Sequence, residues 1–164
     1  NLIMQLKIRD AVQADLPKII QFIKDLAEYE KAPNEVVLSI SDLEQSLFGA
    51  NPQVYCLIAE LENEVTGFAV WHLNYSTWLG KHGIYLEDLY VDPKYRGQGH
   101  GKALLRKLAQ ICVERGYKRL QWWVLDWNQS AIDFYKSIGA EPMDQWTVFR
   151  VSGSSLEKLA TDAS

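Results

Sequence analysis

The stretch from residue 84 to residue 109 constrains the fold more than any other part of the chain. An apolar run at 84–91 has the composition of a strand, and a short polar link follows it. Three alternating glycines, Gly97, Gly99 and Gly101, then open an amphipathic helix. Glycines at a strand-to-helix turn leave backbone N–H groups exposed at the positive end of the helix dipole. The stretch therefore predicts a phosphate-binding loop.

The spacing of the glycines excludes two common phosphate loops. A dinucleotide fingerprint requires G-x-G-x-x-G, but its third glycine would fall on Lys102 and comes one residue early, at Gly101. A nucleotide P-loop requires Ser or Thr after Gly-Lys, where this chain has Ala103, and Arg96 replaces its first glycine. What remains is R-x-x-G-x-G, from Arg96 to Gly101; the alternative is an ordinary glycine-rich turn without a ligand.

Composition limits the class of protein. The chain has 164 residues, which suits one domain able to bury a core without disulfides. The net charge of -4 and the pI near 5.4 argue against broad nucleic-acid binding and fit a cationic substrate. No apolar run approaches the roughly 20 residues that span a bilayer, and the start lacks a secretion pattern. We therefore expect a cytoplasmic protein that binds no membrane.

A few residues invite a metal or redox interpretation. The two cysteines, Cys56 and Cys112, lie in apolar segments and are predicted to be buried reduced thiols. His72 lies in a strand-like run and is predicted to be a core histidine rather than a ligand. Because no Cys or His cluster has ligand spacing, no metal is expected. The sequence leaves open whether Met4 is the natural start, with residues 1–3 a remnant before it.

Hydrophobic periodicity predicts one α/β unit in the order β-α-α-β-β-β-α-β-α-β. Asp15 is expected to cap the first helix, and Ser41 with Glu44 to form a capping box for the second. Gly116 is expected to end the helix that follows the glycine loop. The expected strands are 6–9, 54–60, 65–75, 84–91 and 120–125, with a last hairpin of 142–143 and 146–151; the expected helices are 16–29, 41–49, 102–115, 129–138 and 156–160.

Two motifs in this order resemble the GNAT N-acetyltransferases. The first is R-x-x-G-x-G at Arg96 to Gly101, and the second is W-N-x-x-A-x-x-F-Y-x-x-x-G-A at Trp127 to Ala140. The resemblance implies a GNAT fold, a mixed central sheet flanked by helices, as a single domain over residues 4–164. It also implies acetyl-CoA as co-substrate, no metal, and direct attack by the acceptor in a ternary complex.

Further segments resemble the diamine acetyltransferase subfamily, which includes spermidine/spermine and thialysine acetyltransferases. They are 24–30, 75–78, 85–91 and 125–129. The resemblance implies a homodimer and a small-molecule amine substrate. The cofactor contacts that it implies are Leu89, Tyr90, Val91, Arg96, Gly97, Gln98, Gly99, His100, Gly101, Lys102, Asn128 and Tyr135. The acceptor contacts that it implies are Tyr29, Glu30, Ser76 and Glu87.

Acetyl transfer to an amine requires a base for the ammonium proton and an acid for the departing thiolate. Glu87 is the candidate base, and the alternative is that it only binds the cation. Asp88 is expected to face the other side of a regular strand, and to be structural unless a bulge redirects it. Tyr135 is the candidate acid, as the resemblance implies, and the alternative is a core tyrosine.

The acceptor is predicted from a difference within the subfamily. Spermidine acetyltransferases typically have an acidic residue and a proline where this chain has Ser76 and Thr77, and the pair Leu125-Asp126 also resembles the thialysine branch. A missing carboxylate weakens attraction for a second, distant ammonium group, so a thialysine-like or lysine-like acceptor is favoured. Polyamines and protein lysines remain alternatives, and so does a coenzyme A sensor without turnover. Trp78 and His82 either cover the surface or line the acceptor pocket.

Overall fold

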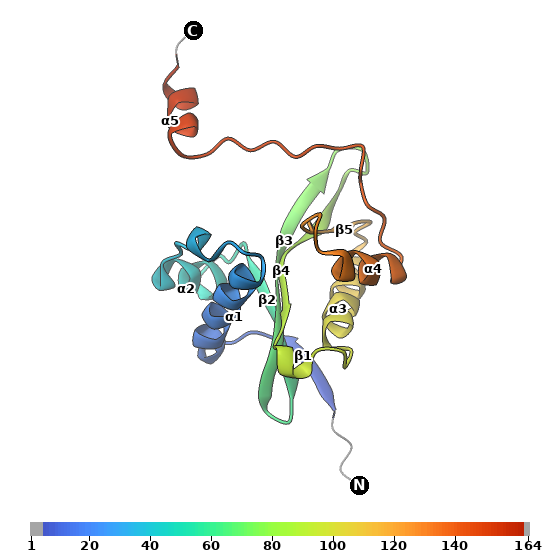
Figure 1. Ribbon diagram of the computed structural model, residues 1–164. Helices are drawn as coiled ribbons and strands as arrows, with labels where there is room; N and C mark the ends of the chain where they lie inside the picture. Colours follow the sequence, from blue (N-terminus) through green and yellow to red (C-terminus); the bar gives the residue numbers. More distant parts are fainter. Residues whose placement is uncertain (1–4, 163–164) are drawn as a thin grey trace. The chain divides into compact units, whose positions relative to one another are not determined.

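A five-stranded mixed sheet forms the centre of the first part of the chain (Figure 1). Its strands stand in the order β1-β2-β3-β4-β5; the first four are antiparallel, and β5 is parallel to β4. The predicted mixed sheet is confirmed. The strands are β1 (Leu6–Asp10), β2 (Tyr55–Leu61), β3 (Glu64–Ser76), β4 (Lys81–Val91) and β5 (Leu120–Gln121).

The computed structural model describes residues 5–162, so the question of Met4 lies outside the described residues. The chain divides into two compact units, one through Leu125 and one from Asp126, and each is described by itself. The expectation of a single domain over 4–164 stays a prediction. None of the described helices is long and apolar enough to cross a membrane.

Helices cover both faces of the sheet in the first unit (Figure 1). Helices α1 (Leu16–Tyr29) and α2 (Ile40–Phe48) lie on one face, and α3 (His100–Arg115) lies on the other. Short 3-10 turns occur at 13–15, 33–35 and 93–95. On the α1 face, apolar side chains of α1, β3 and β4 form a core that includes Ile19, Phe22, Phe68, Val70 and Tyr90. We call this side of the sheet the α1 face.

Local signals located most helix ends correctly, but two predicted caps were wrong. Asp15 precedes α1 without capping it, because its carboxylate accepts hydrogen bonds from Arg9 Nη1 at 2.8 Å and Nη2 at 2.9 Å. Such a charge-assisted pair is stronger than a neutral cap. The second helix begins at Ile40 because Ser39, not Ser41, accepts the hydrogen bond from the Asp42 N–H group.

The end of α3 confirms the role predicted for its glycine. Gly116 adopts a φ of 73°, which residues with a side chain rarely take, and its N–H group bonds to carbonyls of the last turn. The two cysteines are buried and free, as predicted. Strand β5 is shorter than predicted, because only Leu120 and Gln121 pair with β4.

The second unit contains α4 (Gln129–Ser137) and α5 (Gly153–Thr161). The hairpin predicted at 142–143 and 146–151 is wrong, because these residues form no strand in the structure. The segment is rich in residues that favour strands, yet Trp146, Val148 and Phe149 are each more than half exposed. Such propensity needs a neighbouring strand to pair with, and residues 126–162 of this unit contain none.

Candidate active site

Strand β4 has one edge that is only partly paired. Strand β3 pairs with nearly its whole length on one side, but β5 pairs only with Ile84 and Tyr85 on the other. Beyond Tyr85, no strand of the described residues pairs with this second edge. The backbone groups of 86–91 that point away from β3, among them the N–H groups of Leu89 and Val91, are therefore available to a ligand. The predicted cofactor contacts in this segment are Leu89, Tyr90 and Val91.

The glycine loop after β4 has the geometry of a phosphate cradle. Gly97 and Gly99 adopt φ angles of 77° and 86°, and a Cβ atom at either position would meet no atom within 4 Å. Gly99 precedes α3 without any side chain capping the helix. The first N–H groups of α3 are therefore open to an anion at the positive end of the helix dipole. Gly101 lies in this first turn, and the side chains of Gln98 and Lys102 are exposed.

Arg96 is held beside the loop by groups that leave its charge uncompensated. Its Nε donates a hydrogen bond to the carbonyl of Val91 at 3.0 Å. Its guanidinium lies 5.3 Å from the ring centre of Tyr29 and 5.2 Å from that of Tyr90. No carboxylate of the described residues forms an ion pair with it. The guanidinium can thus bind an anionic ligand, and it contacts the predicted acceptor residue Tyr29.

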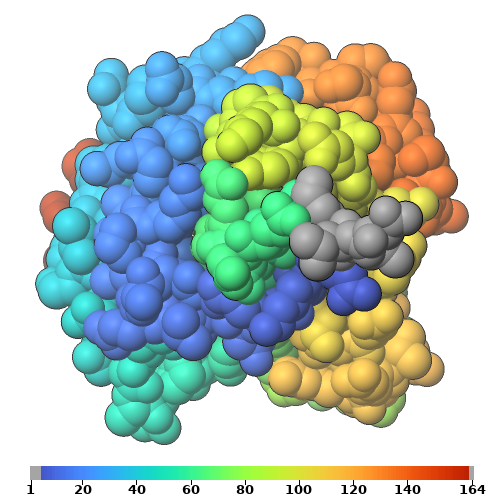
Figure 2. Space-filling model, turned by 90° about the horizontal axis from the view of Figure 1, so that it is seen from below, coloured from blue at the N-terminus to red at the C-terminus, as the bar shows by residue number. Residues whose placement is uncertain are grey.

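The buried side chain of His100 links the glycine loop to β3. Its side chain is only 4% exposed, and its Nδ1 lies 2.7 Å from the hydroxyl of Thr66 on β3. Burial lowers the pKa of His100. The ring stacks on Tyr95, whose hydroxyl donates a hydrogen bond to Glu64. The segment after β4 accordingly lies beside the turn between β2 and β3 (Figure 2). Only the backbone of His100 is then available for the predicted cofactor contact.

We expect Thr66→Val to lower the free energy of unfolding by about 1–3 kcal/mol. Valine keeps the shape of threonine but removes the hydroxyl that also donates to the Ala59 carbonyl, so buried polar atoms of His100 and Ala59 lose their partner. Urea unfolding measures the change. Thr66→Ser keeps the hydroxyl and should retain more stability than Thr66→Val; the reverse order would contradict this account.

A β-bulge redirects the acidic pair on β4. Val70 pairs with Asp88 and Trp71 pairs with Leu86, so Glu87 is the extra residue of the bulge. Cross-strand partners share a face of the sheet, and Val70 belongs to the core under α1. Asp88 therefore lies on the α1 face. The expectation that Asp88 faces the other side was limited to a regular strand, and the exception that it left open is the one found here, because a bulge shifts the alternation.

Glu87 lies on the same face as Asp88. Its carboxylate is 3.6 Å from Nε2 of His72, and cross-strand pairing puts His72 two residues along β3 from Val70. The His72 side chain is 36% exposed and that of Glu87 is 56% exposed. His72 is therefore not the core histidine that was predicted. Among the described residues, no group of three His, Cys, Asp or Glu side chains could hold a metal ion.

Three carboxylates raise the negative charge of the α1 face. Burial raises the pKa of Asp88 to about 6, and the charges of Glu87 and Glu30 add to this effect. Burial also raises the pKa of Glu30, which follows directly after α1. Carboxylates that are held together in this way are stabilised by a bound cation, which offsets their repulsion. The arrangement suits a protonated amine.

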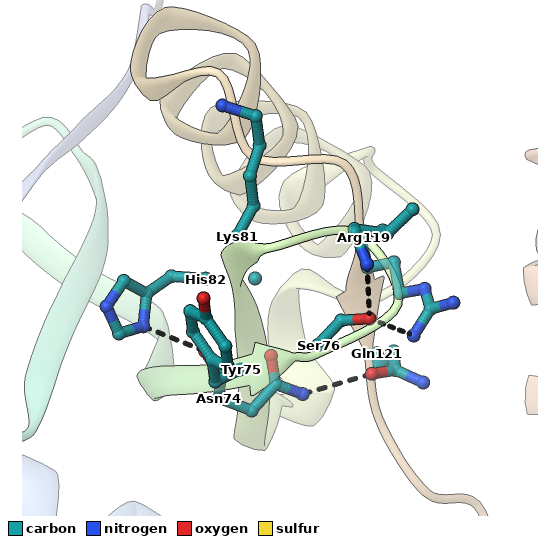
Figure 3. A pocket seen from close by; sticks show the side chains of 9 residues that line it. Asn74, Tyr75, Ser76, Lys81, His82, Arg119 and Gln121 are labelled. Atoms are coloured by element: carbon teal, nitrogen blue, oxygen red, sulfur yellow. Dashed lines mark hydrogen bonds between the residues drawn. The ribbon is translucent and has the colours of Figure 1, made fainter.

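Ser76 lies at the other end of the sheet from this acidic group. It pairs with Lys81, and the strand from Lys81 to Glu87 rises about 20 Å. Its hydroxyl accepts hydrogen bonds from the Leu79 N–H group at 3.2 Å and from Arg119 at 3.3 Å, in a shallow polar pocket (Figure 3). Tyr29, Glu30 and Glu87 thus lie near one another within one chain, whereas Ser76 does not join them.

The other two residues near Ser76 also have local partners. His82 Nδ1 lies 3.1 Å from the carbonyl of Asn74, and its ring contacts Tyr75 and Tyr117 (Figure 3). Trp78 is 80% exposed at the turn between β3 and β4. Neither residue lies near Glu87 in the same chain, which favours surface coverage for both.

Two predicted site residues belong to the second unit. Asn128 caps α4, because its side-chain oxygen accepts a hydrogen bond from the Ala131 N–H group at 3.4 Å. Tyr135 lies in the same helix, half-buried, with its ring centre 5.6 Å from that of Phe134. The cap fixes where the helix begins, and hence which residues share the face of Tyr135.

Comparisons with known proteins agree with this geometry. The profile of the acetyltransferase (GNAT) family matches residues 20–140. The chain belongs to the GNAT acetyltransferase family. The thialysine N-epsilon-acetyltransferase of Bos taurus is 39% identical, over 93% of this chain and 96% of its own length. The spermidine/spermine N(1)-acetyltransferase-like protein 1 of Homo sapiens is 36% identical, over 94% of this chain and 24% of its own length.

Solved structures of other proteins have the same fold. An aminoglycoside acetyltransferase from a soil metagenome superimposes with a TM-score of 0.75 at 27% identity, covering 91% of this chain and 97% of its own. An integron cassette protein of V. cholerae reaches a TM-score of 0.80 at 28% identity, covering 97% and 99%. The predicted GNAT fold and the resemblance to the diamine and thialysine acetyltransferases are confirmed.

GNAT enzymes use acetyl-CoA as co-substrate, and the residues of this chain fit it. The space above Gly97 and Gly99 is open, the start of α3 lacks a capping side chain, and Arg96 has no anionic partner among the described residues. These features suit a pyrophosphate. The unpaired edge of β4 offers backbone groups to an amide-containing chain such as the pantetheine arm.

Asp88 is the residue of this site to which sequence reasoning assigned a role only on the condition of a bulge. Its position depends on the bulge, and the bulge depends on how β3 and β4 pair. The sequence did contain one hint. Two adjacent acids, Glu87 and Asp88, interrupt an otherwise apolar strand, and a regular strand would have to bury one of them unpaired.

Proposed function

We propose that this GNAT enzyme transfers the acetyl group of acetyl-CoA to a primary amine of a small cationic acceptor, with thialysine or a lysine-like amine favoured. The observation that supports this most directly is the group of three carboxylates, Glu30, Glu87 and Asp88, on the α1 face. A primary amine is mostly protonated at neutral pH, so it is attracted to such a group. Tyr29 adds an aromatic surface beside it.

The choice of acceptor rests on relatives and on one position. Thialysine N-epsilon-acetyltransferases of several animals are 34–39% identical to this chain over most of its length. Ser76 and Thr77 bear no charge where an acidic residue would attract a second ammonium group. A polyamine or a protein lysine is the second candidate, since a spermidine/spermine acetyltransferase-like protein is also similar.

The chain's own residues bind and orient both substrates. Acetyl-CoA, when bound, supplies an activated acetyl thioester. Arg96 and the loop from Gly97 to Lys102 hold its pyrophosphate, and Asn128 is a further contact to the cofactor. Backbone N–H groups of Leu89 and Val91 orient the pantetheine arm and polarise the thioester carbonyl, and Tyr90 lies between them. Glu87 holds the amine, and Tyr135 donates a proton to the departing sulfur.

Release of free thiol from acetyl-CoA tests the proposal. The acceptors are thialysine, lysine, spermidine, simple diamines and a lysine peptide, each at the same concentration. We expect the highest kcat/KM for thialysine or lysine. A preference for spermidine would support the polyamine alternative instead. Tight binding of coenzyme A with no thiol release from any amine would indicate a sensor and would overturn the enzymatic proposal.

We also propose that the enzyme is a cytoplasmic homodimer whose apolar C-terminal part supplies the interface. Phe149 is 93% exposed in the second unit, and Val148 and Leu159 are also exposed. Large exposed apolar groups mark interaction surfaces. Light scattering should give twice the chain mass of 18.8 kDa, and Phe149→Asp should shift the mass toward that of one chain. A wild-type monomer at micromolar concentration would contradict this prediction.

A further inference from the structure

We propose that Asp88, and not its neighbour Glu87, is the base that accepts the proton of the amine. The inference rests on the proposed transfer of acetyl to a cationic amine and assigns one role within that site. Glu87 then acts as the carboxylate that binds the ammonium group. The distinction follows from the different surroundings of these two adjacent side chains.

The bulge places both carboxylates on the α1 face but in different environments. Glu87 is 56% exposed and has His72 at 3.6 Å as an ion-pair partner when the imidazole is protonated. Asp88 is more buried, opposite Val70, at the border of the apolar core. No hydrogen bond or ion pair joins the side chain of Asp88 to another of the described residues. Among the described residues, no side chain therefore stabilises the charge of Asp88, whereas water, and His72 when it is protonated, stabilise that of Glu87.

Burial and two neighbouring carboxylates favour the protonated form of Asp88. Burial is the largest effect, and the negative charges of Glu87 and Glu30 act in the same direction, so the pKa of Asp88 rises to about 6. A base works best when its pKa lies near the operating pH, because it is then both unprotonated and basic. Asp88 meets this condition. The titratable and charged groups facing it are Glu87, Tyr85 and Tyr90 on β4, His72 on β3, Cys56 on β2 and Glu30 after α1.

With Asp88 as the base, each proton released in the reaction has a destination. The ammonium group of the acceptor loses two protons in total, while one C–N bond forms and the C–S bond of the thioester breaks. Asp88 takes the first proton, directly or through a water molecule, and releases it to solvent after turnover. The second proton leaves the nitrogen as the C–S bond breaks and ends on the sulfur by way of Tyr135. No oxidant or further reactant is needed.

The pH dependence of kcat/KM separates Asp88 from Glu87. In the wild type, kcat/KM should fall below about pH 6, as the free enzyme takes up a proton at Asp88. We expect Asp88→Asn to remove this acidic limb and to lower the plateau by about 100-fold. Glu87→Gln is the matched control, since it removes the adjacent carboxylate. The acidic limb of kcat/KM should remain in Glu87→Gln but move to lower pH, because Asp88 has lost a negative neighbour. The KM of the amine should rise.

A second measurement does not depend on turnover. Because the pKa of Asp88 is raised in the folded state, its ionisation destabilises the fold; the stability is present below about pH 4 and is lost as the pH rises through 6. Asp88→Asn removes this loss, so its Tm at pH 7.5 should exceed that of the wild type by a few degrees. The gain should vanish at pH 4. Carbon NMR of the Asp88 carboxyl in the wild type gives the same midpoint directly.

Each outcome supports or overturns the assignment. An acidic limb that survives in Asp88→Asn but disappears in Glu87→Gln would make Glu87 the base. Loss of the limb in both variants would also overturn the assignment to Asp88 alone, and so would a carboxyl midpoint near pH 4. If the wild type acetylates none of the amines while the NMR midpoint stays near 6, the proposed function is wrong. The raised pKa of Asp88 would still stand.

Discussion

Tyr135→Phe should lower kcat by about 100-fold or more, with little change in the dissociation constant of coenzyme A. The substitution removes only the hydroxyl, and the ring keeps its contact with Phe134 in α4. A thiolate leaves more slowly when no acid is available to protonate it. Because the lost interaction forms mainly as the C–S bond breaks, the effect should appear in kcat rather than in binding. Steady-state kinetics with isothermal titration of coenzyme A measure both quantities.

Tyr75→Phe is the matched control for this experiment. It makes the same chemical change on an exposed tyrosine at the end of β3 and should leave kcat unchanged. Full turnover by Tyr135→Phe would show that water or another group protonates the sulfur. A rise in the dissociation constant without a fall in kcat would instead make Tyr135 a binding residue.

Features that depend on local sequence were predicted correctly. The bounds of α1 follow from apolar spacing, and the end of α3 follows from Gly116, since a left-handed backbone favours glycine wherever it occurs. The glycine loop belongs to this group, because its φ angles and its position before a helix are encoded within a few residues. The two caps that were predicted wrongly show the limit of prediction from local sequence. The carboxylate of Asp15 pairs with Arg9 on β1 instead of capping the helix, and the pattern of capping residues does not reveal this pairing.

Features that depend on pairing between distant segments were predicted less well. Residues 120–125 and 146–151 have strand-like compositions, yet only Leu120 and Gln121 pair. Strand propensity describes how a side chain fits a sheet and does not tell whether a neighbouring strand is present. The bulge at Glu87 is of the same kind, since it is a property of the register between β3 and β4. The position of Asp88, and with it the acid–base chemistry, therefore required the structure.

Gly99→Ala should weaken coenzyme A binding by about 100-fold. The new Cβ would project into the open space above the loop, where the pyrophosphate is proposed to lie. Losing two hydrogen bonds to a charged phosphate, at roughly 1.5 kcal/mol each, corresponds to this factor. Alanine at a φ of 86° also strains the backbone by about 1–2 kcal/mol. Isothermal titration with coenzyme A measures the affinity, and urea unfolding measures the strain.

Gly80→Ala separates these two effects. Gly80 lies in the turn between β3 and β4 with a φ of 63°, and a Cβ atom there would also meet nothing within 4 Å. The two variants should therefore lose similar amounts of stability, but only Gly99→Ala should lose affinity for coenzyme A. A wild-type affinity in Gly99→Ala would mean that the space above Gly99 is not where the phosphate binds. Equal losses of affinity would mean that strain, and not occupied space, weakens binding.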